Sequence, residues 1–504
     1  MSIQVLATYI FFAYLAITLL LGWWGRRNMR GATIQEYYTA GKSVGPWLGL
    51  ATYAASNFSA FTFLGSVGIY YTQGLGYASL PLGQMFFLGI LFPTVGYKIW
   101  KFSRDPEVLT LTDIVARRYE EDPLVRALFA LTNIVFMFFL MGVQVVGISY
   151  VIEKVTGGII SYAAAAFTVA VVLIIYQTLG GMRGVVYTDV LQLCVLTFTL
   201  ISVLVTIFIN FDVTAVFQRL AISDKAALLS APGPQGIWNS TYWGTSFVAF
   251  GVGWFMWPHF WSRIIASRDK RSMVSIPLGL IMGMTLFLVI ITPMVAFVAA
   301  DLWPTEEALA GYSPDQIIIR FMFEYLPIPL AALMLAGASA AAMSTVDSLS
   351  LVLSSIAFHD LYERLLGTTL NEAQKTTWAR IVTALFPAVA TLIALRPPGL
   401  IVGLVIDTSF AAFTALAPAV ILGFYWPRAT TQGARWSISL GLAAVLVIIG
   451  GWKNPFGLNV YSGFWTLVIS TVVLVVVSLV TRPVSADVLR YFGLASSSAG
   501  ERKD

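Results

Sequence analysis

The chain has 504 residues, of which 58% are hydrophobic and only 11% are charged, and its mean hydropathy is +0.81. Soluble domains have about 25% charged residues, so this composition excludes a soluble globular protein and predicts a polytopic membrane protein. The net charge of +5 does not imply a nucleic-acid partner, because Lys and Arg in membrane proteins mostly mark the loops that face the cytoplasm.

Long apolar runs follow one another along the whole chain. A helix needs about 20 apolar residues to cross the hydrocarbon core of a bilayer. The first run continues through Trp24 into basic residues without a small-residue cleavage motif, so we expect a first span rather than a cleaved signal peptide. The predicted fold is all-α, with thirteen spans near 3–24, 46–71, 77–100, 125–150, 158–179, 184–210, 241–264, 273–300, 327–358, 379–395, 399–426, 434–452 and 460–481.

Basic residues divide the connecting loops into two groups. With thirteen spans, every loop rich in Lys and Arg falls on the same side, which the positive-inside rule makes cytoplasmic. The N-terminus is then outside, and the short polar tail is inside and expected to be disordered. The basic residues counted are Arg26, Arg27, Arg30, Lys98, Lys101, Arg104, Arg117, Arg118, Arg126, Arg183, Arg263, Arg268, Lys270, Arg271, Arg364, Lys375, Arg380, Arg428 and Arg435.

The second span has many polar and small residues at its centre. Residues 55–65 read ASNFSAFTFLG, with Ser56, Asn57 and Ser59 in succession and Gly65 at the end. Asn and Ser compete with helical hydrogen bonding, and Gly loosens a helix further. Irregular backbone is tolerated inside a membrane only where it faces a cavity. This span is therefore predicted to break.

Carboxylates lie inside the sixth and ninth spans. GGMRGVVYTDVLQ (180–192) places Asp189 about two turns into the sixth span, and GASAAAMSTVDSLS (337–350) places Asp347 beside Ser344 and Ser348. A carboxylate at the centre of a span costs at least about 2.5–3.5 kcal/mol on insertion scales, so both clusters are predicted to be functional. Such oxygen-rich groups suit a hard cation, sodium or a proton. The alternatives for Asp189 are an ion pair with Arg183 and capping of backbone groups.

The seventh span is interrupted in a similar way. GVGWFMWPHFWSR (251–263) has glycines and Pro258 inside an apolar run, and proline removes a backbone hydrogen bond and clashes one turn back. Trp254, one turn before the proline, is a candidate for a solute cavity. His259 is expected to satisfy freed backbone groups rather than transfer protons. In the eleventh span Asp407 is a third intramembrane acid, for which a buried pairing role and a functional one are equally open.

Matched interruptions in spans 2 and 7 indicate two inverted five-helix repeats. We therefore expect a first helix and cytoplasmic loop (1–45), a first repeat (46–210), an extracellular loop (211–240), a second repeat (241–426), two further helices (427–481) and a cytoplasmic tail (482–504). The chain has no GxxxxGK[ST] stretch, which argues against an ATP-driven pump. Its one cysteine, Cys194, and two histidines exclude an intramolecular disulfide and the usual zinc or haem spacings.

At these residues the chain resembles the sodium/solute symporter family, which includes sodium/proline, sodium/pantothenate, sodium/monocarboxylate and sodium/glucose symporters. The resemblance spans the second to the eleventh predicted spans and includes the thirteen-span topology. Its most specific pieces are SNFSAFTFLGSVGIYYTQGLG, GGMRGVVYTDVLQ, GWFMWPHFWSR and AAAMSTVDS. Together they imply a secondary transporter rather than an enzyme.

The resemblance also implies binding residues. The family's sodium site, carried over, places carbonyl ligands at Ala55, Phe58 and Ala341 and hydroxyl ligands at Ser344 and Thr345. A second cation site of some members falls on Asp189 and Ser348, but Asp347 stands where a serine is expected, which leaves a second sodium, a proton or neither. The solute contacts implied by the span 2 break and by the aromatic stretch before the PH pair are Asn57, Ser59, Thr62, Phe250, Trp254 and Pro258.

The expected function is inward symport of sodium (Na+) with a small organic solute through the cell membrane by alternating access. An amino acid such as proline, a pantothenate-like acid and a short monocarboxylate all remain candidates. Sugar is disfavoured, because Phe61 and Thr62 replace polar residues of the sugar-transporting branch. The alternatives are a membrane solute sensor with the same fold and proton-coupled symport. The expected partners are the solute and the lipid bilayer, with no nucleic acid and no obligate protein partner.

Overall fold

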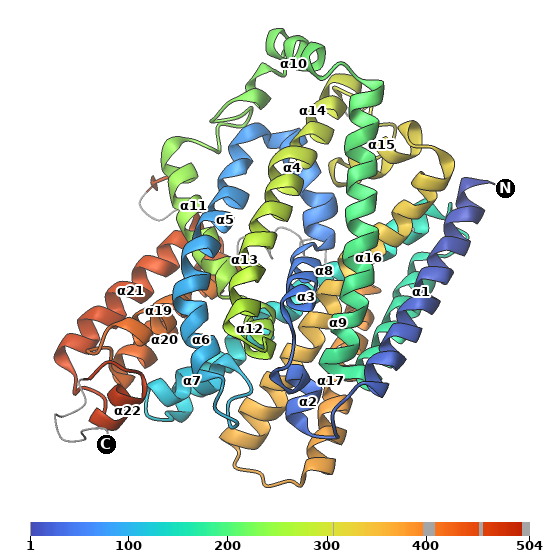
Figure 1. Cartoon of the computed structure of the whole chain (residues 1–504). Helices are drawn as coiled ribbons and strands as arrows, with labels where there is room; N and C mark the ends of the chain where they lie inside the picture. Colours follow the sequence, from blue (N-terminus) through green and yellow to red (C-terminus); the bar gives the residue numbers. More distant parts are fainter. Residues whose placement is uncertain (1, 306, 397–408, 453–456, 496–504) are drawn as a thin grey trace.

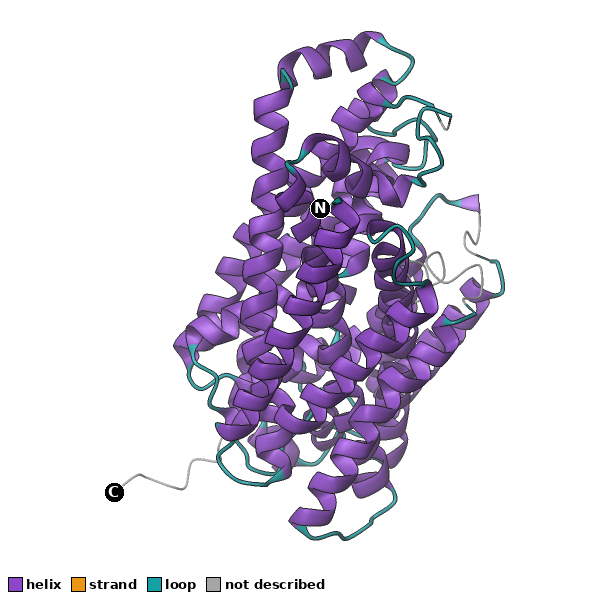
Figure 2. Cartoon of the chain, turned by 90° about the vertical axis from the view of Figure 1, so that its right-hand side faces the viewer, coloured by secondary structure: helices purple, strands orange, loops and turns teal. Residues whose placement is uncertain are grey.

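The computed structural model describes residues 2–305, 307–396, 409–452 and 457–495. Within these ranges the regular structure is helical, apart from an isolated bridge between Val44 and Ser267. Nine helical runs in the described part are long and apolar enough to cross a membrane by length and composition. Figures 1 and 2 show the helices running mostly along one long axis, with loops gathered at its two ends.

Helices of the first half of the chain follow the apolar runs closely. The Ser2 side chain caps the first helix, and Arg26 and Arg27 stand in its last turn, where cations interact favourably with the helix dipole. The helices are α1 (Ile3–Arg27), α2 (Ile34–Thr39), α3 (Pro46–Asn57), α4 (Ser66–Gln73), α5 (Ser79–Leu91), α6 (Tyr97–Phe102), α7 (Leu111–Arg118), α8 (Pro123–Val155), α9 (Tyr162–Asn210) and α10 (Val213–Ile222).

Helices of the second half complete the bundle. Among the outer ones, α21 exposes Val472, Val476 and Val480, and an outward apolar face of this kind suits lipid rather than water. The helices are α11 (Ser240–Phe255), α12 (Pro258–Ala266), α13 (Lys270–Met284), α14 (Thr292–Leu302), α15 (Ile317–Tyr325), α16 (Ile328–Ser355), α17 (Glu372–Ala394), α19 (Phe410–Tyr425), α20 (Thr431–Ile449), α21 (Ser462–Val480) and α22 (Ala486–Tyr491).

Two predicted spans, 158–179 and 184–210, form one long helical run, α9, that turns at Gly181. The Gly181 dihedrals, φ 51° and ψ −147°, lie outside the helical range. A side chain there would meet the Tyr37 carbonyl oxygen at 2.7 Å. Glycine is therefore required by both the backbone conformation and the space.

Helix α16 lies inside the bundle and packs against α1, α3, α8, α9 and α17. Nearly every residue from Ala331 to Ser355 is buried. Small residues allow the close approach: a Cβ at Gly337 would lie 2.6 Å from Thr199 Oγ1. The polar cluster predicted from the ninth span is thus surrounded by protein and not by lipid.

Backbone interruptions occur at two places near the bundle centre. Helix α3 ends at Asn57; Phe58 is extended (φ −83°, ψ 104°), and the chain returns to a helix through a wide turn at Phe61–Gly65. Helix α11 ends at Phe255; Trp257 is extended (φ −70°, ψ 127°), and Pro258 opens α12. Proline suits this first helical position because the missing N–H would be unpaired there anyway.

The C-terminal tail corrects one prediction. It was expected to be disordered, but residues 486–491 form α22, and Phe492 is buried with its ring 4.5 Å from that of Phe102. The tail therefore packs against the same end of the bundle as α7 (Figure 1). Residues 397–408, which include the start of the predicted eleventh span and Asp407, and residues 496–504 lie outside the described residues.

Candidate functional site

Oxygen atoms from α3 and α16 converge where α3 ends. The Ser344 hydroxyl donates to the Ala55 carbonyl at 2.9 Å and lies 3.1 Å from that of Ala341. The Thr345 hydroxyl donates to the Ala341 carbonyl at 3.2 Å. Both hydroxyl side chains are buried. Carbonyl and hydroxyl oxygens held together out of water are the ligands that hard cations prefer.

Phe58, the fifth residue predicted for this ion site, is the first residue beyond α3. Its backbone is extended and not helical, and its ring packs edge-on against Phe287 with centroids 5.2 Å apart. The structure thus joins Ala55, Ala341, Ser344 and Thr345 by direct contacts and places Phe58 at the adjoining helix end.

Asp189, Asp347 and Ser348 lie together one turn further along, as the sequence predicted for a second cluster. The Thr52 hydroxyl donates to Asp189 Oδ2. The Ser348 hydroxyl lies 3.1 Å from Asp347 Oδ1 and 2.9 Å from the Ser56 hydroxyl. Asp347 Oδ2 accepts a 2.7 Å hydrogen bond from the Tyr176 hydroxyl. Thr52 and Tyr176 were missed by sequence reasoning, because each lies in an apolar run without a polar cluster of its own.

Arg263 occupies this second cluster, contrary to its assignment as a cytoplasmic loop residue. Its side chain is 1% exposed. The guanidinium lies 3.4 Å from Asp189 Oδ2 and also donates to the Ser348 hydroxyl. The alternative partner considered for Asp189, Arg183, pairs instead with Glu36. The position of Arg263 in GWFMWPHFWSR, directly after an apolar run, made it resemble a residue that marks the end of a span.

Five of the six residues predicted to contact solute lie together near the end of α3. The Asn57 Oδ1 atom accepts hydrogen bonds from Trp254 Nε1 at 2.9 Å and from Gln84 Nε2 at 3.3 Å. Thr62, Phe250, Trp254 and Gln84 line a small cavity of about 10 Å³, which has room for about one water molecule. Ser59 bonds to Thr62 at 3.0 Å. Pro258 is elsewhere: it lines a different small cavity with Tyr38 and Trp261.

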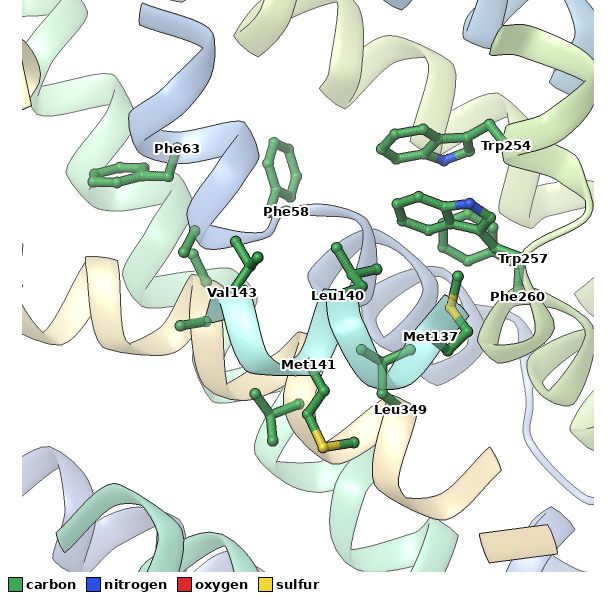
Figure 3. Close-up of a cluster of buried hydrophobic side chains, with 14 of the residues drawn as sticks. Phe58, Phe63, Met137, Leu140, Met141, Val143, Trp254, Trp257, Phe260 and Leu349 are labelled. Carbon is green, nitrogen blue, oxygen red and sulfur yellow. The ribbon is translucent and has the colours of Figure 1, made fainter. Parts of the chain in front are cut away.

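Aromatic rings form one wall of this region. The Trp254 and Trp257 rings stack with centroids 4.2 Å apart, and the Phe410 ring lies 5.4 Å from that of Trp254. Figure 3 shows both indoles and Phe260 on the side of the cluster facing Phe58. Among the described residues, the buried Asn57 Nδ2, Trp257 Nε1 and Gln84 Oε1 atoms have no hydrogen-bond partner. Such atoms are expected to find partners in a ligand or in water.

His259 corrects another prediction. It was expected to satisfy backbone groups freed at Pro258. It is fully buried, and within the described ranges neither ring nitrogen has a hydrogen-bond partner. Its ring packs instead against Phe260, with centroids 4.2 Å apart.

A separate group of buried charged residues links the 98–126 loop to residues 356–365, the helical turn that follows α16. His359 Nε2 lies 3.0 Å from Asp113 Oδ2, and Arg126 lies 2.9 Å from Asp113 and 3.3 Å from Asp360. Asp113, His359 and Asp360 are close enough together to hold a metal ion. The Arg126 guanidinium already neutralises the carboxylates, so the arrangement is that of a salt-bridge network.

The sequence is similar to known membrane transporters over most of its length. The sequence model of the sodium:solute symporter family matches residues 37–441. The chain is 28% identical over 424 residues to a sodium/pantothenate symporter of Haemophilus influenzae, covering 84% of this chain and 86% of that protein. It is 25% identical over 496 residues to the sodium/proline symporter of Escherichia coli, covering 97% and 95%.

Two solved structures share the fold. A substrate-bound, outward-open Na+-coupled sialic acid symporter superposes with a TM-score of 0.79 at 18% identity, covering 95% of this chain and 98% of that chain. Mhp1, a nucleobase-cation-symport-1 family transporter, superposes with a TM-score of 0.52 at 13% identity, covering 90% and 94%. At these identities the likeness concerns the fold alone.

Proposed function

This chain belongs to the sodium:solute symporter family, and from that premise we propose that it moves a small organic solute into the cell together with sodium by alternating access. It is a multi-pass membrane protein whose relatives are transporters. The observation that carries the proposal is the contact of Ser344 on α16 with the Ala55 carbonyl at the end of α3. A coupling ion at this point would hold the interrupted helix against its neighbour.

The proposed sodium ligands are the carbonyl oxygens of Ala55, Phe58 and Ala341 and the hydroxyls of Ser344 and Thr345. Four of these residues already contact one another through the oxygens in question. In the structure the two hydroxyls donate their protons to the carbonyls of Ala55 and Ala341. Sodium would replace those two protons as the partner of the carbonyl oxygens, while each hydroxyl turned a lone pair toward the ion.

The proposed topology has thirteen spans, with spans 2–6 and 7–11 as inverted five-helix repeats, the N-terminus outside and the tail cytoplasmic. The backbone interruptions at Phe58 and Trp257 lie inside the predicted spans 2 and 7. Each of these spans is the first helix of a proposed repeat. The external loops proposed at 211–240 and 301–326 lie at one end of the molecule, and α7 and α22 lie at the other (Figure 1).

For the solute we propose a small molecule with a carboxylate: an amino acid such as proline, a pantothenate-like acid or a short monocarboxylate. Asn57 Nδ2 and Trp257 Nε1 offer unpaired donors beside the interrupted backbone. Proline and pantothenate, named in the relatives, are both carboxylic acids. The Trp254 and Phe250 rings give an apolar wall for the rest of the molecule.

Sodium and solute would favour each other's binding, because both stabilise the same arrangement of the α3 end. Coupling of this kind is reciprocal and typically about 1–3 kcal/mol. An inside-negative potential adds about 2.3 kcal/mol per charge for every 100 mV. The cavity of about 10 Å³ is too small for any of these solutes, so their entry requires movement of α11 or of the residues around Phe61.

The test is uptake of radiolabelled proline, pantothenate and pyruvate into proteoliposomes. We expect accumulation of one of them under an inward sodium gradient. Accumulation driven equally well by a proton gradient alone would replace sodium with proton coupling. Sodium-dependent binding without any uptake would favour the second candidate, a solute sensor.

A further inference from the structure

The Arg263 guanidinium is held in the centre of the bundle by contacts on several helices. Its Nε atom lies 3.3 Å from the Thr52 hydroxyl on α3, and its Nη2 atom contacts both Asp189 on α9 and Ser348 on α16. The other terminal nitrogen, Nη1, donates to the backbone carbonyl of His259 at 3.0 Å, within α12 itself. This side chain is thus a fixed cation, placed by the helix that starts directly after the Trp257 interruption.

The groups around Arg263 are those that would otherwise bind a free cation. Asp189 Oδ2 and the hydroxyls of Thr52 and Ser348 all contact the guanidinium or lie within its hydrogen-bonding shell. These are oxygens of the kind that bind sodium. A guanidinium and a sodium ion cannot both occupy the space between them, and each would neutralise the same carboxylate.

We propose that Arg263 takes the place of a second cation, so that this protein binds a single sodium ion per transport cycle. The inference rests on the proposed sodium symport and deepens it, because it assigns the ion stoichiometry. Asp189 then has an internal counter-charge in addition to the Thr52 hydroxyl, and Asp347 accepts from the hydroxyls of Tyr176 and Ser348. Because the guanidinium is covalently attached to α12, it remains in the protein when the sodium ion leaves.

Removing the guanidinium should therefore create a site. In Arg263→Ala, the Asp189 oxygens and the hydroxyls of Thr52 and Ser348 would surround a buried space without a cation. Asp189 Oδ1 is also buried and has no partner among the described residues. A buried carboxylate without a counter-charge is strongly unfavourable, so sodium would be drawn into the vacated position. In Arg263→Lys a cationic group remains, and no site should appear.

The experiment is equilibrium binding of ²²Na+ to the purified full chain, which needs no knowledge of the solute. We expect one sodium per molecule for the wild type and for Arg263→Lys, two for Arg263→Ala, and one again for Arg263→Ala combined with Asp189→Asn. Each variant is first checked by its thermal unfolding transition. If Arg263→Ala does not fold, the number of sodium ions bound per wild-type molecule still tests the proposal.

Two sodium ions bound by the wild type would overturn the inference and leave sodium symport standing. A single ion bound by folded Arg263→Ala would also overturn it. Absence of specific sodium binding to the wild type is a different result, since it would remove the proposed sodium coupling itself.

Discussion

Trp254 donates its indole N–H to Asn57 Oδ1 at 2.9 Å, although 197 positions separate the two residues. Asn57 is the last residue of α3, and Trp254 lies in the last turn of α11. One hydrogen bond therefore links the two helices at the points where each is interrupted. This bond therefore holds the Asn57 side chain in place beside the interrupted backbone.

Replacement of Trp254 by phenylalanine is expected to weaken solute binding. The substitution keeps an aromatic ring against Phe410 but removes the donor to Asn57. A hydrogen bond of this kind contributes about 0.5–1.5 kcal/mol, so the solute Kd should rise roughly two- to tenfold. The measurement is sodium-dependent binding of the radiolabelled solute. Trp243→Phe on the same helix is the control, and an equal effect there would contradict a specific role.

Ser344→Ala and Thr345→Ala should each raise the sodium concentration needed for half-maximal uptake. Each removes one oxygen proposed to bind the ion, and an interaction with a charged partner contributes about 1.5–3 kcal/mol. The expected increase is roughly ten- to hundredfold. Ser350→Ala is the matched control, because Ser350 lies on the same helix and donates only locally, to the Val346 carbonyl at 2.7 Å. Unchanged sodium dependence in both variants would remove these hydroxyls from the site.

The crossing of α5 and α11 should tolerate no side chain at its closest point. A Cβ at Gly83 would lie 2.1 Å from the Phe247 carbonyl oxygen, and one at Gly251 would lie 2.3 Å from that of Gly83. Overpacking of this kind costs about 1–3 kcal/mol, so Gly83→Ala and Gly251→Ala should each lower the Tm. In Gly142→Ala the new methyl group meets nothing within 4 Å, and its Tm should not fall. Equal Tm values for all three would show that the helices can separate freely.

Arg126→Gln should destabilise the protein strongly. Burial raises the pKa of the Asp113 carboxyl, but His359 and Arg126 outweigh burial and hold this pKa well below its usual range. Asp113 is therefore ionised at neutral pH, and without Arg126 its charge loses a buried partner, which costs about 3–5 kcal/mol. The Tm should fall markedly.

Arg117→Gln provides the comparison for Arg126→Gln. Arg117 also pairs with acidic residues, but Glu107 and Glu121 in its group are largely exposed, and such pairs contribute about 0–1 kcal/mol. If the Tm falls as much in Arg117→Gln as in Arg126→Gln, the buried ion pairs of Arg126 stabilise the protein no more than the exposed ones of Arg117.

Much of the architecture could be predicted because its causes are local. Apolar runs of sufficient length, basic loops and the residues that weaken helices at Asn57 and Pro258 are all visible along the chain. Ser344, Thr345 and Asp347 were predicted to be functional because polar groups inside a span are costly. The surroundings of His259 could not be predicted, because its burial depends on helices that are far away in the sequence.

The ion-pair partners of the buried charged residues could not be predicted from the local sequence. Asp189 had Arg183 as a near neighbour in sequence, yet it contacts Arg263, 74 positions away, while Arg183 pairs with Glu36. Arg263 had the sequence context of a loop residue and is buried in the bundle centre.

The amino-acid sequence by itself determined that this protein is a helical membrane protein, roughly where its helices lie and which residues inside them are polar. Those properties follow from hydropathy and from backbone chemistry over a few neighbouring residues. The tertiary structure alone decided which oxygens meet and which cation faces each carboxylate. Contacts between helices depend on the packing of side chains hundreds of positions apart, and no local periodicity encodes them.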